Sequence, residues 1–301
     1  MTTAVLARRS APSRRAVSLA IAAGTLAVLV WQVGTGPFLD GLQTVNGTAL
    51  AAAFGLAVMT TVCCAWRWRV VARGLGLDLS LRTAVAAYYR SLFLNVTLPG
   101  GVVGDVHRGI SHGRDTSDVA RGLRAVAWER SAGQVVQVVL TVAVLLVVPS
   151  PVRGSMPLIA LAVLAAAGGV VLVGRAPRWR VALVRELRSG LLARSAWPAV
   201  ALASALIIAG HVATFVIAAH TAGATAPASQ ILPLALLVLA AGALPNIGGW
   251  GPREGVTAWA FAAAGLGASR GVATAVVYGV MVFVASLPGA LVLLTGWVRR
   301  V

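Results

Sequence analysis

YYRSLFLNVTLPGGVVGDVHRG, residues 88–109, is a helical apolar pattern that breaks and then resumes with ionisable side chains. The break is Leu-Pro-Gly-Gly, in which proline removes a backbone donor and glycine permits a tight turn. The apolar run before it, residues 84–98, is too short to cross about 30 Å of hydrocarbon. We therefore predict a re-entrant hairpin over residues 84–104, which enters the membrane and returns to the same face. Irregular backbone at that depth is tolerated only where it is covered by protein or lines a cavity.

A second stretch, residues 244–255, has the same outline and reads LPNIGGWGPREG. Both stretches begin with Leu-Pro, carry glycines in the middle and have a glycine at the twelfth position. Short apolar runs flank the second stretch, so residues 231–267 predict another re-entrant hairpin, from the opposite face. Paired broken helices of this kind are typical of inverted repeats, which form substrate sites near the membrane midplane. The hairpin-breaking residues are Pro99, Gly100, Gly101, Gly104, Pro245, Gly248, Gly249 and Gly251.

The composition is that of a membrane protein. Of 301 residues, 58% are hydrophobic and 11% are charged, and the mean hydropathy is +0.87. Several apolar runs reach the roughly 20 residues that a helix needs to cross hydrocarbon. We predict an all-α, polytopic helical membrane protein with about six full spans plus the two hairpins in an inverted-repeat arrangement. The predicted spans are residues 16–34, 48–66, 131–149, 155–174, 196–219 and 271–296.

The charged residues predict the orientation of the chain. The net charge is +17, and all 25 basic residues are arginines. They gather between spans and at both ends, so the positive-inside rule predicts a plasma-membrane protein with both termini cytoplasmic. Residues 1–15 are expected to form a cytoplasmic tail, and residues 16–298 a single transmembrane domain. Residues 35–47, which lack arginine, are expected to form an outside loop, and Trp66 to Arg69 an aromatic belt with inside charges.

The excess of arginine also bears on the partners of the protein. A soluble protein this basic would suggest nucleic acid, but the chain has no basic soluble segment to bind it, so no nucleic-acid binding is predicted. Anionic lipid headgroups are the natural partners of arginines beside membrane spans.

Four ionisable residues beside the two breaks are candidates for binding. Each Arg or Asp costs about 2.5–3.5 kcal/mol at the centre of a membrane helix, so such groups usually face a cavity and pair with one another. In one interpretation Arg108 and Arg253 contact an anionic headgroup while Asp105 and Glu254 hold them in place. In the other, Asp105–Arg108 and Arg253–Glu254 are structural ion pairs. Helix N-termini after the breaks also suit phosphate.

Further candidates surround the first break. Arg90 and Asn95 lie on the first half-helix, where Arg90 could instead extend to the cytoplasmic surface. Glu129 and Arg130 are expected to open the third span, and an interfacial helix start is the alternative. The substrate-binding candidates are Arg90, Asn95, Asp105, His107, Arg108, Glu129, Arg130, Arg253 and Glu254.

Motifs for catalysis and for cofactors are missing from the sequence. It has neither a Gly-x-Ser-x-Gly nucleophile motif nor a phosphate-binding Walker loop. Cys63 and Cys64 lie in an apolar run as small packing residues, and the histidines have no metal-ligand spacing. We therefore predict no enzyme activity, no cofactor and no metal.

These motifs resemble the lysylphosphatidylglycerol synthase transmembrane-region family, also described as flippase-like membrane proteins. The resemblance covers residues 15–300 and implies an integral membrane protein with re-entrant segments, linked to moving lipids between leaflets. Bifunctional members carry a following soluble aminoacyl-transferase domain. This chain ends at Val301, after its last predicted span, so we expect no synthase activity. The resemblance rests on Phe93-Leu94-Asn95, Leu98-Pro99-Gly100-Gly101, Gly104-Asp105, Arg108, Glu129-Arg130, Pro245, Gly248-Gly249, Gly251 and Arg253-Glu254.

The leading functional hypothesis is translocation of an anionic phospholipid or a polyprenyl-phosphate-linked intermediate between leaflets. Two alternatives stay open. One is a non-catalytic membrane subunit that scaffolds a separate lipid-modifying or cell-envelope enzyme. The other is a membrane-embedded transferase acting on a lipid. A homo-oligomer is compatible with each of them.

Overall fold

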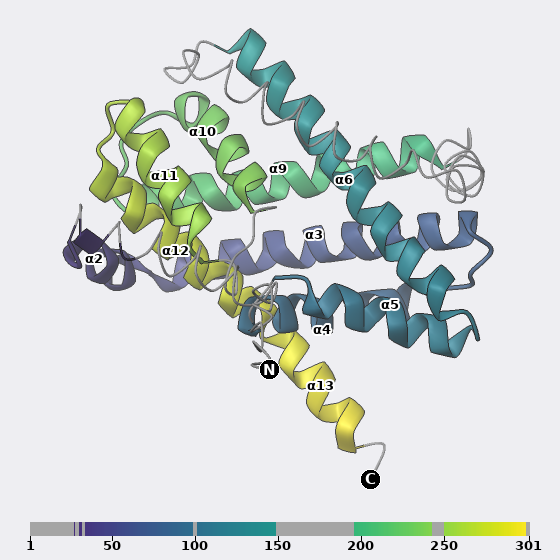
Figure 1. The fold of residues 1–301 in the computed structure, drawn as a ribbon. Coiled ribbons are helices and arrows are strands. Elements are labelled where there is room, and N and C mark those ends of the chain that lie inside the picture. Colours follow the sequence, from purple (N-terminus) through teal and green to yellow (C-terminus); the bar gives the residue numbers. More distant parts are fainter. Residues whose placement is uncertain are drawn as a thin grey trace, which may run out of the picture.

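The structure is a computed structural model that describes residues 27, 30–31, 34–98, 101–148, 196–242 and 250–298, without the side chains of 296–298. These parts of the chain are all-α (Figure 1). Four helical stretches are long and apolar enough to cross a membrane, so the protein is a multi-pass membrane protein. They are α3 (Gly47–Gly74), α6 (Val119–Val147), α9 (Trp197–Thr221) and the continuous run of α12 (Ala268–Ser286) and α13 (Pro288–Val298). The predicted span 155–174 and nearly all of 16–34 lie outside the described residues.

The predicted outside loop, residues 35–47, contains the nine-residue helix α2 (Gly36–Thr44), and its position outside the membrane stays a prediction. Glycine and proline suggested a loop, but a proline in the first turn of a helix costs no hydrogen bond. Gly41 of α2 packs on α12, where a Cβ added to it would lie 2.9 Å from the carbonyl oxygen of Ala273.

Two span boundaries also differ from the prediction. Helix α6 begins at Val119 rather than residue 131, capped by Asp118, whose carboxylate accepts from the Arg121 N–H at 2.8 Å. Glu129 therefore lies well inside the helix rather than at its start. Helix α3 likewise continues to Gly74, so Trp68 is buried in protein instead of standing in an interfacial belt. Arg67 and Glu129 did not end these helices because they face other helices rather than lipid.

The first broken pair consists of α4 (Leu81–Thr97) and α5 (Val103–Asp115), which lie alongside each other in antiparallel directions. Helix α4 ends before the predicted break, whose Pro99 and Gly100 lie outside the described residues. The backbone of α5 then comes very close to α4. A Cβ added to Gly104 would lie 2.1 Å from the Ser91 carbonyl oxygen, so only glycine fits there.

The second broken pair consists of α10 (Ala228–Ala241) and α11 (Pro252–Ala263). Its predicted breaking residues Pro245, Gly248 and Gly249 lie outside the described residues. Gly251 precedes α11 with φ 108°, a left-handed conformation that favours glycine. Both pairs therefore show a helix, an interruption and a second helix, while their entry into the membrane from a given face stays a prediction.

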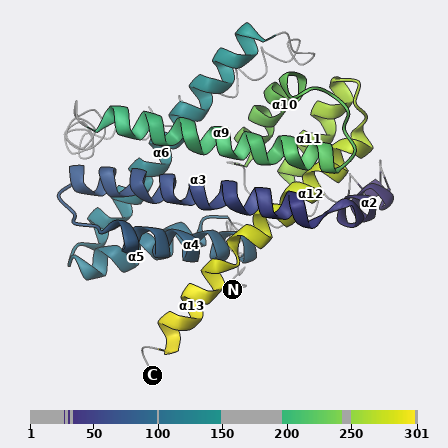
Figure 2. The same cartoon turned by 180° about the vertical axis from the view of Figure 1, so that it is seen from behind.

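The order of elements repeats along the chain. Helices α3, α4, α5 and α6 have 28, 17, 13 and 29 residues. Helices α9, α10 and α11 have 25, 14 and 12 residues and are followed by the α12–α13 run, in which Ala268–Thr295 forms a 28-residue apolar stretch. The leading helices α3 and α9 pack side by side (Figure 2). They are antiparallel, since Arg67 contacts Ser204 while Thr60 lies against Gly210. Opposed leading helices followed by matching elements are the geometry of an inverted repeat.

Candidate functional site

Five charged side chains meet where α3, α5 and α6 come together, and we call them the first arginine cluster: Arg67, Asp105, Arg108, Glu129 and Arg130. Glu129 lies at its centre and is fully buried. Arg67 Nε donates to Glu129 Oε1 at 2.8 Å, and Arg108 Nη2 donates to Glu129 Oε2 at 2.7 Å. Each carboxylate oxygen thus has its own arginine, which offsets much of the cost of burying the charges.

Asp105 joins the first broken pair to α6. Its carboxylate accepts from Arg108 Nε at 3.0 Å, Asn95 Nδ2 at 3.0 Å, Ser91 Oγ at 3.2 Å and Arg130 Nη2. The charge-assisted hydrogen bonds from the two arginines stabilise the ionised form of this carboxylate. The carboxylate is therefore ionised and keeps both arginines in place.

Arg108 is held by aromatic rings as well as by ion pairs. Its guanidinium carbon lies 4.2 Å from the centre of the Tyr88 ring and 4.6 Å from that of Trp68. The Tyr88 hydroxyl in turn donates to Glu129 Oε1 at 3.0 Å. Flat contacts to rings and forked contacts to carboxylates suit the planar guanidinium, so lysine would not replace it.

The first arginine cluster carries an unbalanced positive charge. Three arginines face two carboxylates, a net charge of +1, and the Arg130 side chain is 45% exposed. Within the part of the chain that is described, buried Arg108 Nη1 has no hydrogen-bond partner, and neither have Trp68 Nε1 and His112 Nε2 beside it. Buried unpaired groups are rare in native proteins and require an explanation. This cluster has the charge and the unused donors to take up an anion.

A second arginine cluster lies on the other half of the molecule: Trp250, Arg253, Glu254 and Tyr278. Arg253 Nε and Nη2 donate to Glu254 Oε1 at 2.9 and 2.6 Å. Glu254 Oε2 accepts from the Gly251 N–H at 2.5 Å, which caps the start of α11. The Arg253 guanidinium lies 5.2 Å from the Trp250 ring and 5.4 Å from the Tyr278 ring. In each cluster one arginine, Arg108 or Arg253, therefore lies beside a tryptophan, a tyrosine and a fully buried glutamate.

Helix α9 connects the two clusters. Ser204 Oγ accepts from Arg67 Nη1 at 2.9 Å, and His211 Nδ1 lies 3.4 Å from the Tyr278 hydroxyl. The spacing of seven residues puts Ser204 and His211 on one face of the helix. His211 lies near the middle of α9, which runs from Trp197 to Thr221.

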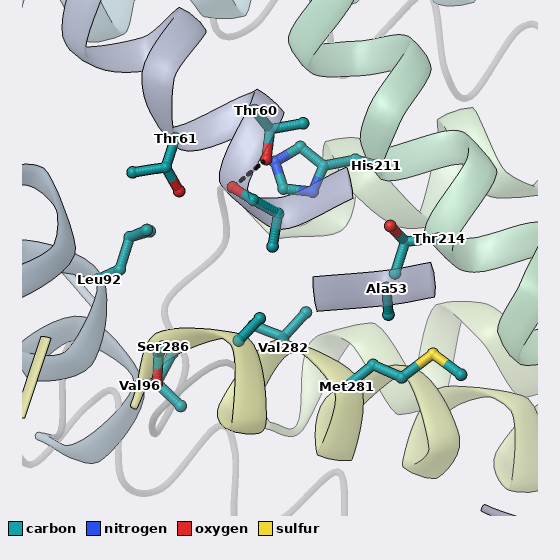
Figure 3. Close-up of a pocket in the computed structure, with 12 residues that line it drawn as sticks. Ala53, Thr60, Thr61, Leu92, Val96, His211, Thr214, Met281, Val282 and Ser286 are labelled. Carbon is teal, nitrogen blue, oxygen red and sulfur yellow. Dashed lines mark hydrogen bonds between the residues drawn. The ribbon is translucent and has the colours of Figure 1, made fainter. Parts of the chain in front are cut away.

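A small cavity, which we call the polar pocket, lies between α3, α4, α9 and α12 (Figure 3). Its volume is about 60 Å³. Apolar side chains of α4 and α12, among them Leu92 and Val282, form part of its wall. The polar residues that line it are Thr60, Thr61, His211, Thr214 and Ser286.

The structure brings together most of the predicted site residues in two groups. Asn95, Asp105, Arg108, Glu129 and Arg130 belong to or contact the first arginine cluster, and Arg253 with Glu254 forms the second. Arg90 lies partly buried on α4, and His107 is exposed on α5. The two local ion pairs that sequence analysis had considered, Asp105–Arg108 and Arg253–Glu254, are both present.

Sequence analysis missed several members of the site. Trp68 and Arg67 looked like a membrane boundary, and the tyrosines and Ser204 had no sequence signal because their partners lie far along the chain. The sequence signal that could have identified them is an arginine next to a tryptophan, Arg67 and Trp68, within one long helix. The missed contact residues are Arg67, Trp68, Tyr88, Ser91, Ser204, His211, Trp250 and Tyr278.

Comparison with known proteins bears on the whole arrangement. A search of curated proteins gave no match. A family model, described as the lysylphosphatidylglycerol synthase TM region, matches residues 15–289, a range that contains both arginine clusters and the polar pocket. This agrees with the resemblance seen in the two Leu-Pro stretches, and the chain therefore belongs to the lysylphosphatidylglycerol synthase TM region family.

Proposed function

We propose that the protein moves an anionic phospholipid or a lipid-linked intermediate between the leaflets of the plasma membrane. The observation that carries the proposal is the net charge of +1 in the first arginine cluster, together with the unpaired Arg108 Nη1. A buried uncompensated charge is costly, so a ligand that supplies the missing negative charge is bound favourably. The phosphate of a lipid headgroup has this charge and matches the guanidinium fork.

The two types of residue in the first cluster have different roles in this proposal. Arg130 is partly exposed, so it is the first group that a headgroup reaches. Arg108 offers its unused Nη1 once the phosphate is inside. Asp105 and Glu129 hold the arginines in position and are not themselves ligands for an anion. The acyl or prenyl tail remains in the lipid.

The orientation of the protein follows from the same helices. Arg73 lies in the last turn of α3, and Arg121 lies in the first turn of α6. These two ends are neighbours, because Arg67 and Glu129 pair across them. By the positive-inside rule, these arginines support a cytoplasmic position for this side of the protein. Arg67 is seven residues from the end of α3, so the first cluster lies about 10 Å along the helix from this end.

The test is a leaflet-resolved assay with the purified protein in liposomes. Labelled anionic phospholipid, zwitterionic phospholipid and polyprenyl phosphate are compared, and headgroup exposure is followed over time. We expect movement of one anionic class and its loss, by about a hundredfold, in the Arg108→Gln/Arg253→Gln variant, because each arginine–phosphate contact contributes about tenfold. Arg121→Gln is the matched control, since its ion pair with Asp118 is exposed.

Two outcomes would contradict the proposal. Unchanged transport by the folded double variant would remove the roles assigned to the arginines. If the folded wild-type protein moves no lipid, the proposal that it translocates lipids is refuted. This result would favour the second candidate, a membrane subunit serving a separate lipid-modifying enzyme, which the family description supports by naming a synthase. Stoichiometric co-purification of such an enzyme checks that candidate.

A further inference from the structure

We propose that Gly133 on α6 is a positioning residue for anion binding at the first arginine cluster. It leaves the space in which the Arg67 guanidinium reaches Glu129, and it thereby keeps Arg108 free for a headgroup phosphate. The inference rests on the proposed function and adds to it a residue that has neither a charge nor a hydrogen-bonding side chain. Gly133 was not a candidate from sequence, because its effect depends on a side chain of another helix.

The Arg67 guanidinium lies directly against the backbone of α6 at Gly133. A Cβ added to Gly133 would lie 2.6 Å from Arg67 Nη1 and 3.0 Å from both Cζ and Nη2. These distances are shorter than van der Waals contact, so a methyl group and the guanidinium cannot both occupy this place. The guanidinium is the group that moves, since it is the end of a flexible side chain.

The atoms that a methyl group would displace are the ones that hold Arg67 in the cluster. Gly133 lies one turn after Glu129 on α6, so the two residues share a helix face. Arg67 Nε donates to Glu129 Oε1 at 2.8 Å, and Nη2 donates to the same oxygen. Arg67 Nη1, the atom closest to the added Cβ, donates to Ser204 Oγ at 2.9 Å. A methyl group at residue 133 therefore disturbs both the bond to Ser204 and the ion pair with Glu129.

The position of Arg67 determines how much of Arg108 is available to a ligand. Glu129 Oε1 accepts from Arg67 and from the Tyr88 hydroxyl, while Arg108 Nη2 donates to Oε2 at 2.7 Å. Among the described residues, Arg108 Nη1 then has no hydrogen-bond partner. When Arg67 is displaced, Glu129 Oε1 loses its arginine and competes with a phosphate for Arg108 Nη1. The charge of Glu129 is also less well compensated, which weakens the attraction of the cluster for an anion.

A glycine has the corresponding place in the second arginine cluster. A Cβ added to Gly279 on α12 would lie 2.7 Å from Arg253 Nη2 and 3.0 Å from the Trp250 ring. Helix α6 is the fourth element of the first set of helices, and α12 begins the fourth element of the second set. Each half of the protein thus places one guanidinium against a helix turn that lacks a side chain. This repetition indicates a shared property of the two halves.

The experiment adds one methyl group and removes no charge. Purified wild-type protein and Gly133→Ala are titrated in non-ionic detergent with dihexanoyl phosphatidylglycerol, a soluble anionic phospholipid, and binding is followed by isothermal titration calorimetry. We expect Gly133→Ala to bind about tenfold more weakly, since one hydrogen bond to a charged group contributes about that factor. Translocation in the liposome assay described above should fall by a similar factor.

Gly55→Ala is the matched control. It is the same substitution in a membrane-spanning helix, α3, but a Cβ added to Gly55 would have no described atom of another element within 4 Å. Both variants gain the higher helix propensity of alanine, so a difference between them reports the contact with Arg67. We expect wild-type binding and wild-type translocation from Gly55→Ala.

A double-mutant cycle tests whether Gly133 acts through Arg67. Arg67→Lys keeps the positive charge but lacks the planar fork that lies against Gly133. We expect Gly133→Ala to have little further effect on binding in the Arg67→Lys background, because the group that it displaces is already absent. If Gly133→Ala alone does not fold, recovery of folding in the double variant supports the contact, and failure of both overturns the inference.

The outcomes separate this inference from the proposed function. If wild-type protein and Gly133→Ala bind the phospholipid equally well, Gly133 is not a positioning residue, and translocation by the wild type is unaffected. An equal loss in both Arg67 backgrounds, or in Gly55→Ala, would also overturn the inference. If wild-type protein binds the phospholipid but moves none, translocation is refuted and the cycle still decides the role of Gly133. If wild-type protein does not bind the phospholipid, the inference is refuted.

Discussion

Replacing Glu129 with glutamine removes the central negative charge of the first arginine cluster while keeping the size of the side chain. The native carboxylate accepts from Arg67, Arg108 and Tyr88 and is fully buried. Its removal changes the net charge of the cluster from +1 to +2. An amide N–H group would also face arginine donors.

The expected loss of stability follows from the cost of a broken buried ion pair. Removing one partner of such a pair costs about 3–5 kcal/mol, because the other charge stays buried without compensation. Arg67 loses its carboxylate partner here, whereas Arg108 keeps Asp105, so a loss of about 3–5 kcal/mol is expected for Glu129→Gln. An exposed pair contributes about 1 kcal/mol or less. Arg121→Gln, which breaks the exposed pair with Asp118, therefore serves as the control.

The assay is equilibrium unfolding of the purified variants in mixed micelles, followed by circular dichroism and tryptophan fluorescence. A second variant, Arg67→Gln in the Glu129→Gln background, returns the net charge to +1. We expect it to be more stable than the sum of the two single effects, since the residues are in contact. A Glu129→Gln protein no less stable than Arg121→Gln would refute the view that Glu129 organises the cluster, and so would strict additivity in the double variant.

Two further variants test contacts of the first broken pair. Gly104→Ala should destabilise the fold by about 2 kcal/mol or more in unfolding assays, because its Cβ would lie 2.1 Å from the Ser91 carbonyl oxygen and two backbones would have to separate; an unchanged midpoint would contradict this packing. Arg108→Lys should lower both stability and lipid movement. A lysine cannot pair with Asp105 and Glu129 and also lie flat on the Trp68 and Tyr88 rings. Wild-type stability together with wild-type lipid movement would refute this reasoning.

The lengths of the membrane helices show where sequence reasoning failed. Charge was taken to end a span, and α6 was accordingly predicted to begin at residue 131. The helix begins at Val119 because Glu129 faces α3 and α5, where arginines compensate it. Hydropathy along a chain measures the cost of a charge in lipid, and it carries no information on which charges meet one another. For the same reason, Arg67 and Trp68 were predicted to mark the end of a membrane span.

The parts of the candidate site that could be predicted are contacts between residues close together in the sequence. Asp105 with Arg108 and Arg253 with Glu254 are near neighbours in sequence beside Pro/Gly breaks, and their ion pairs are present. Contacts between distant residues had no such signal. Ser204 is 137 residues from Arg67, and His211 is 67 residues from Tyr278.

The sequence by itself determined that this is an all-α membrane protein with helices interrupted near Pro99 and before Pro252. These properties depend on local chemistry, since apolar length sets what crosses a membrane and proline with glycine sets where a helix stops. Only the tertiary structure decided that three arginines share two carboxylates and that α3 and α9 run antiparallel with a polar pocket between them. Those properties depend on which helix faces meet, and helix packing chooses among many pairings that one amphipathic pattern allows.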